Sequence, residues 1–243
     1  LTRGHAALGA YGEGRHWRYY QKITWASSVF ALFTDLALSL LGGTLKAKGQ
    51  LSGRFADVFS WLFIAQSSLR RFDEEGQIEE DLPLLHYSLD RSFYEVKVAF
   101  DGILANFNHP LFKYTIAPIF KLLFAINPIG HSIKDDTEFE LARMIQNNVA
   151  QRKRLNEGIF IPTGDNERFA QLEKAFAAFH DTKGIHKKVR AAAKAKKIKK
   201  AHPTDLYTQS MEQNIISKEE FDNVTQVNKM ANEVIQVDDF PAQ

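Results

Sequence analysis

The sequence predicts an all-α protein: a helical bundle built on an antiparallel helical hairpin, with a C-terminal helical extension. Two long segments, Trp25–Leu41 and Leu51–Glu75, carry apolar residues in the pattern of buried or half-buried helices. The connection Gly42–Gln50 is short, so the two helices must run antiparallel. A hydrophobic content of 44% with nineteen phenylalanines supplies enough apolar surface for a substantial core.

The segment Trp25–Leu41 has apolar residues on nearly every face and a single charge, Asp35. Such a helix is surrounded either by protein or by lipid. A bilayer span needs roughly 20 apolar residues with few charges. The modest length and Asp35 therefore favour the protein core. A buried carboxylate is costly unless it is paired, so we expect Arg54 or Lys22 to neutralise Asp35 in a structural ion pair.

Glycine and proline mark the ends of the next helices. Gly76 ends the helix Leu51–Glu75, and Asp81 with Pro83 starts a third helix that runs to about Phe107. Between them lies an acidic cluster, which we interpret as a solvated loop and not as an acid/base pair. Its members are Glu74, Glu75, Glu79, Glu80 and Asp81.

The segment Leu111–Ile129 is strongly apolar, is interrupted by Pro118, and carries only Lys113 and Lys121 as charges. It is either a kinked core helix or an apolar surface element that enters a lipid interface. In the second case the two lysines would reach toward headgroups. The candidate membrane contacts in this segment are Phe112, Lys113, Phe120, Lys121 and Phe124.

The remaining helices follow from capping signals. Asp135 or Asp136 is expected to cap a helix that runs to about Arg154, and Asp165 to start another. Ser217–Glu220 has the spacing of a capping box at the start of the last helix. We assign residues 1–180 to the helical bundle, beginning with a Gly-rich loop at 1–14. Residues 181–243 form the basic extension and an acidic tail that docks by Phe240 or is free.

The segment Lys183–Lys200 contains nine basic residues and no acid. One interpretation is a solvated helix on the outside of the fold. Another is a patch for anionic lipid, worth about 1 kcal/mol per basic residue near the surface. Nucleic acid is disfavoured because no aromatic side chain is interleaved for base stacking. The candidate lipid contacts are Lys187, Lys188, Arg190, Lys194 and Lys197.

A search for catalytic or metal-binding motifs is negative. The sequence has no GxSxG, HExxH, Walker or Rossmann pattern. The eight histidines are scattered without the spacing of metal ligands on a helix face, so we predict no metal site. The absence of cysteine fits a reducing compartment, and a net charge of +2 gives no general attraction to nucleic acid.

Several segments together resemble the C-terminal region of the large bacterial acyl-coenzyme A dehydrogenases of fatty-acid β-oxidation. The resemblance covers nearly the whole chain, is clearest in residues 1–105 and is weakest in 183–236. The segments are Leu41–Lys46, Leu51–Val58, Leu69–Gly76, Asp81–His86 and Val237–Phe240.

The resemblance implies a parent enzyme that binds FAD and converts a fatty acyl-CoA to the trans-2-enoyl-CoA. In that family a glutamate removes the α proton and the flavin takes the β hydride. The residues for these tasks lie upstream of the region matched here, so no catalytic or FAD-binding residue is assigned in this chain. In related very-long-chain enzymes a comparable extension serves dimerisation and membrane attachment.

Two functions remain open at this point. The first is the non-catalytic C-terminal part of such a dehydrogenase, inactive alone, which packs against its flavin-binding catalytic half, a second subunit or an anionic membrane surface. The chain begins at Leu1 without a methionine, so we expect a piece of a longer protein. The expected location is the cytoplasm, peripheral on the inner face of the plasma membrane. The alternative is a free-standing helical membrane- or protein-interaction module without enzymatic activity.

Overall fold

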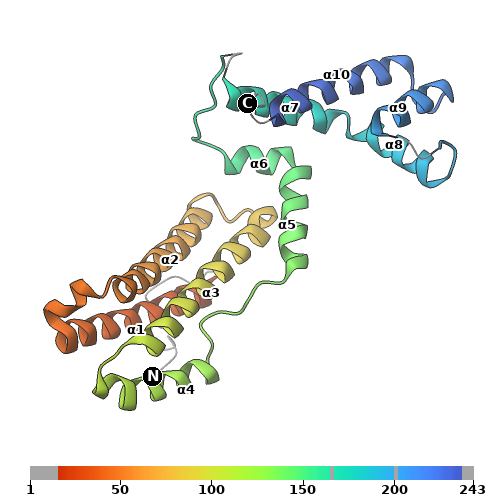
Figure 1. Ribbon diagram of the computed structural model, residues 1–243. Helices are drawn as coiled ribbons and strands as arrows, with labels where there is room; N and C mark the ends of the chain where they lie inside the picture. Colours follow the sequence, from red (N-terminus) through yellow and green to blue (C-terminus); the bar gives the residue numbers. More distant parts are fainter. Residues whose placement is uncertain (1–15, 165–166, 200–201, 237–243) are drawn as a thin grey trace, which may run out of the picture. The chain divides into compact units, whose positions relative to one another are not determined.

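The computed structural model describes residues 16–164, 167–199 and 202–236 (Figure 1). These residues form ten α-helices, two short 3₁₀ turns and one π turn, and none of them lies in a β-strand. The all-α prediction is confirmed. The predictions for the loop 1–14, the helix start at Asp165 and the tail around Phe240 lie outside the described residues.

The packing of the chain divides it into two compact units, residues 1–154 and 155–243. The sequence predicts the boundary at 180/181, where the composition becomes basic. The difference arises from α7 (Arg168–Asp181), which packs along α10 (Lys218–Ile235) of the second unit. Its small buried residues, Ala170 and Ala175, allow this close approach.

The first unit is built on three long helices, α1 (Trp17–Leu41), α2 (Gly49–Glu74) and α3 (Leu82–Asn106). The 3₁₀ turn η2 (Gly42–Ala47) joins α1 to α2, and the two helices lie side by side as the predicted antiparallel hairpin (Figure 1). Gly42 ends α1 with a φ of +50°, a conformation that glycine adopts without steric cost.

The turn between α2 and α3 lies where glycine and proline predict the helix ends. Gly76 has a φ of +87°, and the backbone N–H of Gln77 donates to the carbonyl of Phe72, which closes the end of α2. The 3₁₀ turn η3 (Glu79–Asp81) then leads into α3, with Pro83 in the first turn. The prediction of two helices separated near Gly76 is confirmed.

Phe33 of α1 lies at the centre of the first core. Its ring centroid is 5.4 Å from that of Phe100, 5.6 Å from Phe112 and 4.7 Å from Phe120. All three pairs are close to perpendicular, at 88°, 77° and 76°, the edge-to-face arrangement that aromatic rings favour. These contacts join α1, α3 and the segment after α3 in one core.

The segment after α3 is a broken helix. A π-helical turn, η4 (Phe112–Ile116), precedes α4 (Ala117–Ile126), which carries Pro118 in its first turn. Proline fits there because an N–H in the first turn has no intrahelical partner. Phe112, Ala117 and Phe124 are buried, as the interpretation of a kinked core helix predicts.

The region predicted as one helix from Asp135 to Arg154 forms two, α5 (Asp135–Asn147) and α6 (Val149–Leu155). The break falls at Asn148, whose side-chain oxygen accepts from the backbone N–H of Gln151 at 3.0 Å. The predicted aspartate cap is also wrong. Lys134 occupies the N-cap position without a side-chain cap bond. Asp135 and Asp136 lie in the first turn, where their negative charges interact favourably with the helix dipole.

The second unit contains α7, α8 (Lys183–Lys194), α9 (Pro203–Glu212) and α10. A small core forms where α8, α9 and the start of α10 meet. Ser217 caps α10 and forms the complete capping box with Glu220, as predicted. The buried members of this core are Ile185, Val189, Ala192, Ile198, Ile216 and Val224.

Candidate functional site

One side of α1 is uncovered within the described residues. The sequence predicts a helix surrounded on all sides, yet only 17% of its most apolar 18-residue window is buried. By length and composition Trp17–Ala47 could cross a membrane, which is weak evidence for a span because core helices pass the same test. The exposed residues recur at helical spacing: Ser28, Ala31, Leu32, Asp35, Leu38 and Ser39.

The uncovered side of α1 continues onto α2. Leu38 is 56% exposed, and Phe59 and Phe63 of α2 are 60% and 64% exposed. The ring of Phe30 lies 6.3 Å from that of Phe59, so the two helices are in contact there. We call Ala31, Leu38, Phe59 and Phe63 the open face. Exposed apolar side chains that gather on two neighbouring helices are typical of an interaction site.

Asp35 lies on the exposed side of α1, so the prediction of a buried ion pair is wrong. No ion pair connects it to Lys22 or Arg54 within the described part of the chain. The ammonium of Lys22 instead lies 4.3 Å from the ring centroid of Phe93, and the Arg54 side chain lies against Gly102 of α3. The reason is the rotation of α1, which directs Phe33 into the core and Asp35 away from it.

The three phenylalanines proposed as membrane contacts face the core. Phe112 is completely buried, Phe124 is 7% exposed, and Phe120 packs on Phe33. A lipid surface cannot reach Phe112 or Phe124 in this fold, so these two assignments are wrong. Lys113 and Lys121 are exposed, as the lipid interpretation requires. The large apolar residues of the segment that are exposed are Leu111, Tyr114, Ile119, Leu122 and Ile126.

The basic residues of the second unit point outward. Ile185, Val189 and Ala192 bury one side of α8, which leaves its lysines on the other side. Lys188 donates to Glu220 at 2.5 Å, and the remaining candidates form no described ion pair. All five residues chosen from the sequence are exposed: Lys187, Lys188, Arg190, Lys194 and Lys197. Lipid contact by these residues stays a prediction.

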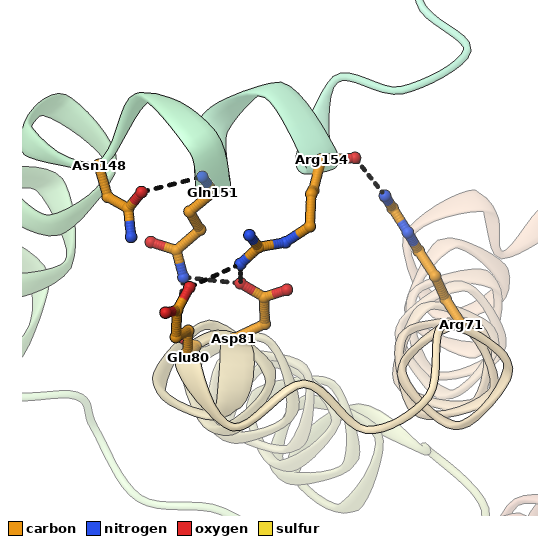
Figure 2. A network of polar contacts seen from close by, with 6 residues as sticks. All are labelled: Arg71, Glu80, Asp81, Asn148, Gln151 and Arg154. Carbon is orange, nitrogen blue, oxygen red and sulfur yellow. Dashed lines mark hydrogen bonds and ion pairs between the residues drawn. The ribbon is translucent and has the colours of Figure 1, made fainter.

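The acidic cluster between α2 and α3 is only partly solvated, contrary to the prediction. Asp81 is 8% exposed, and its Oδ1 accepts from Nε2 of Gln151 at 2.7 Å and from Arg154 at 3.2 Å. Gln151, fully buried, also donates to the carbonyl of Glu80 (Figure 2). This network fixes α6 on the start of α3.

The described residues contain neither a cluster of metal-binding side chains nor a β-strand. No group of three or more histidines and carboxylates that could hold a metal ion occurs among residues 16–164, 167–199 and 202–236. His16 and His86 do approach, with ring centroids 6.2 Å apart, but inside an aromatic cluster with Phe72. The same residues fold without a strand, so they form no strand–loop–helix cradle for a dinucleotide.

The family comparison decides what the chain is. The family model described as acyl-CoA dehydrogenase, C-terminal, bacterial type, matches residues 1–240. The chain belongs to this family. No solved structure matches it. Membership in the acyl-CoA dehydrogenase C-terminal family implies a catalytic N-terminal part in the same protein. Acyl-CoA dehydrogenases are in general FAD-dependent oxidoreductases, and membership implies such a parent enzyme for this chain.

Proposed function

We propose that this acyl-CoA dehydrogenase C-terminal region is non-catalytic, and that it packs through the open face against the catalytic part of its parent. The supporting observation is α1, whose composition is that of a fully enclosed helix while its outer side is uncovered in this chain. Burying a phenylalanine such as Phe59 or Phe63 contributes about 1.5–3 kcal/mol. A protein surface placed there would supply the missing enclosure. The parent reaction would be the oxidation of a fatty acyl-CoA to its trans-2-enoyl form.

A protein is a better occupant of the open face than a bilayer. Asp35 lies on the same exposed side of α1 as Ala31 and Leu38. A carboxylate near the centre of a bilayer costs roughly 2.5–3.5 kcal/mol on insertion scales. A protein partner can instead offer a cation or a hydrogen-bond donor to Asp35.

The test replaces two exposed phenylalanines in the parent protein. The variant is Phe59→Asp with Phe63→Asp, and the matched control is Phe160→Asp, because Phe160 is 83% exposed in the second unit. Release of bound FAD on heating is followed by flavin fluorescence. The double variant should release flavin at a temperature lower by roughly 5 °C or more. The control should behave as the wild type.

The same substitutions in the isolated chain separate packing from folding. Because Phe59 and Phe63 are mostly exposed, their replacement should change the stability of the isolated chain by no more than about 0.5 kcal/mol. Unchanged flavin release in the parent variant contradicts the proposal. So does an isolated chain that is dimeric in light scattering and becomes monomeric in the double variant, because the open face then joins two copies.

A membrane-surface role for the second unit is a separate proposal, supported by the five exposed cations on and after α8. Neighbouring α7 exposes Phe169, Leu172 and Phe179 by 41%, 43% and 45%, which gives the same unit apolar side chains. Cations combined with exposed aromatic residues are typical of elements that lie on anionic membranes.

Sedimentation with vesicles tests this second role. The variant is Lys187→Gln, Lys194→Gln and Lys197→Gln, which spares Lys188 because of its ion pair with Glu220. Loss of three surface cations should weaken binding to vesicles with anionic lipid on the order of 100-fold. Equal binding by wild type and variant would remove the electrostatic part of the proposal. The control variant neutralises three exposed lysines outside α8 that form no described ion pair: Lys46, Lys153 and Lys218.

A further inference from the structure

A cavity of about 550 Å³ lies in the first unit, between the first half of α3, the loop 127–134 and α5. Lys22 of α1 contributes to its wall. The volume is within the range of small-molecule sites. The proposed packing role through the open face does not use this cavity.

The walls of the cavity are held by specific contacts. Gly130 is buried, and a Cβ atom at this position would lie 2.4 Å from the backbone of Phe93, so the loop rests directly on α3. On the other side the Tyr87 hydroxyl of α3 donates to Glu138 of α5 at 3.0 Å. These contacts fix the loop and α5 relative to α3, so the cavity is part of the folded unit.

Lys22 is the least solvated charge of the cavity wall. Burial lowers the pKa of its ammonium, and the negative charge of Asp90 partly offsets this effect. Its ammonium lies over the Phe93 ring, and no ion pair connects Lys22 to a carboxylate within the described residues. The cation has lost hydration without gaining a direct counterion, which favours a bound anion at this point.

The other wall residues define the rest of the ligand. Lys134 and His131 of the loop offer further hydrogen-bond donors, while Asp90 and Glu140 offer acceptors. Leu141 and Met144 of α5 supply apolar surface. A ligand that satisfies all of these groups carries an anionic head, at least one hydroxyl and a short carbon skeleton.

We propose that this cavity binds a small hydroxylated organic anion, a hydroxy acid or a phosphate ester. Lys22 and Lys134 hold the carboxylate or phosphate, and the ligand hydroxyls donate to Asp90 and Glu140. Leu141 and Met144 contact the carbon skeleton. The proposal concerns the first unit alone and does not depend on the packing of the open face.

Titrations of the complete chain test the proposal with three probes: glycerol 3-phosphate, lactate and, as an uncharged control, glycerol. The imidazole Cε1–H resonances of His86 and His131 are followed by NMR and assigned with His86→Gln and His131→Gln. At least one anion should shift these resonances saturably, and glycerol should not. The preferred anion distinguishes a phosphate ester from a hydroxy acid.

Substitutions at the cavity locate the binding site. Lys22→Met should weaken binding about tenfold or more, because a charge-assisted hydrogen bond is lost. Lys46→Met, at an exposed lysine on η2, should bind as the wild type. Met144→Trp fills the cavity, leaves Lys22 in place and should abolish binding. This variant tests the site even if Lys22→Met does not fold. Absence of saturable shifts with both anions, or wild-type binding by Met144→Trp, overturns the proposal.

Discussion

The two units of this chain use different means to hold their helices together. Among the residues that the structure describes, the core of the first unit contains 24 buried residues, seven of them phenylalanines, whereas the core around α8–α10 contains six and no phenylalanine. Large buried aromatic surfaces stabilise the first unit by burial and ring packing. The second unit has less apolar surface to bury, so specific polar contacts have a larger share in its stability.

The polar contacts of the second unit lie between its helices. Arg168 of α7 donates to the carbonyls of Val234 and Gln236 at 3.1 and 2.7 Å, which places a cation at the C-terminus of α10. Nδ1 of His186 on α8 lies 2.5 Å from the Tyr207 hydroxyl of α9. These contacts define helix positions that apolar packing alone would leave loosely specified.

Tryptophan fluorescence distinguishes the unfolding of the two units. Trp17, Trp25 and Trp61 are the three tryptophans of the chain, and all belong to the first unit. Tryptophan fluorescence therefore reports unfolding of the first unit alone, while far-UV circular dichroism reports the helices of both.

The largest expected effect is in the aromatic core. Phe33→Ala removes the ring at its centre and should destabilise the first unit by about 4 kcal/mol, because transfer and cavity costs add. Urea unfolding followed by tryptophan fluorescence measures this effect. The matched variant Val224→Ala, in the fully buried part of the second core, should cost about 2 kcal/mol and act only on circular dichroism. A shift of the fluorescence midpoint in Val224→Ala would show that the units unfold together.

The next largest effect concerns the contribution of a polar contact to the stability of the first unit. Gln151→Ala removes the two hydrogen bonds to Glu80 and Asp81 and should cost about 2 kcal/mol, since one acceptor is a buried carboxylate. Hydrogen exchange of the α6 amides should accelerate in this variant. Lys153→Ala, an exposed neighbour on the same helix, is the control. Equal exchange rates in both variants would mean that the network does not fix α6.

A smaller effect is expected at the start of α10. Ser217→Ala removes the side-chain acceptor of the Glu220 N–H and should cost about 1 kcal/mol in the second unit. The change should appear in circular dichroism and not in tryptophan fluorescence. Thr225→Ala, whose exposed hydroxyl only bonds within the same helix, serves as the reference. A loss no greater than that of the reference would argue against the importance of the capping box.

The smallest effect concerns pH and His186. Burial lowers the pKa of His186, and the nearby Arg190 charge lowers it further. The unfolded chain therefore binds the proton more readily, with a pKa of about 6.5. The stability that neutral His186 provides is present above that pH and is lost as the pH falls toward the lower pKa of the folded state. Circular dichroism midpoints at pH 7.5 and 5.5 should differ more in the wild type than in His186→Gln; equal differences would contradict the assignment.

Sequence patterns predicted much of this fold because helix signals are local. Gly76 predicts the C-terminal end of α2, and Pro83 predicts the start of α3. Ser217 and Glu220 predict the start of α10. Each of these signals depends on only a few neighbouring residues, so it can be recognised without the tertiary structure. The resemblance to the dehydrogenase family was likewise carried by continuous segments.

The candidate sites were less predictable because they depend on the rotation of one helix against another. Helical spacing assigned Phe112 and Phe124 to an apolar segment, but only packing against Phe33 and its neighbours shows that they face inward. Gln151 and Asp81 are 70 residues apart, and no local pattern connects them. Lys22, Asp90 and Lys134 come from three elements, so the cavity between them has no continuous signature in the sequence.

The sequence by itself determined the helical class, the family and several helix ends, such as those at Gly76 and Ser217, because each depends on neighbouring residues or on continuous segments. Only the tertiary structure decided which side of α1 is uncovered, where Asp35 points and how Asp81 is satisfied. These outcomes depend on distant helices competing for the same apolar surface. Tertiary packing, and not the helix propensity of neighbouring residues, decides which side chains are buried.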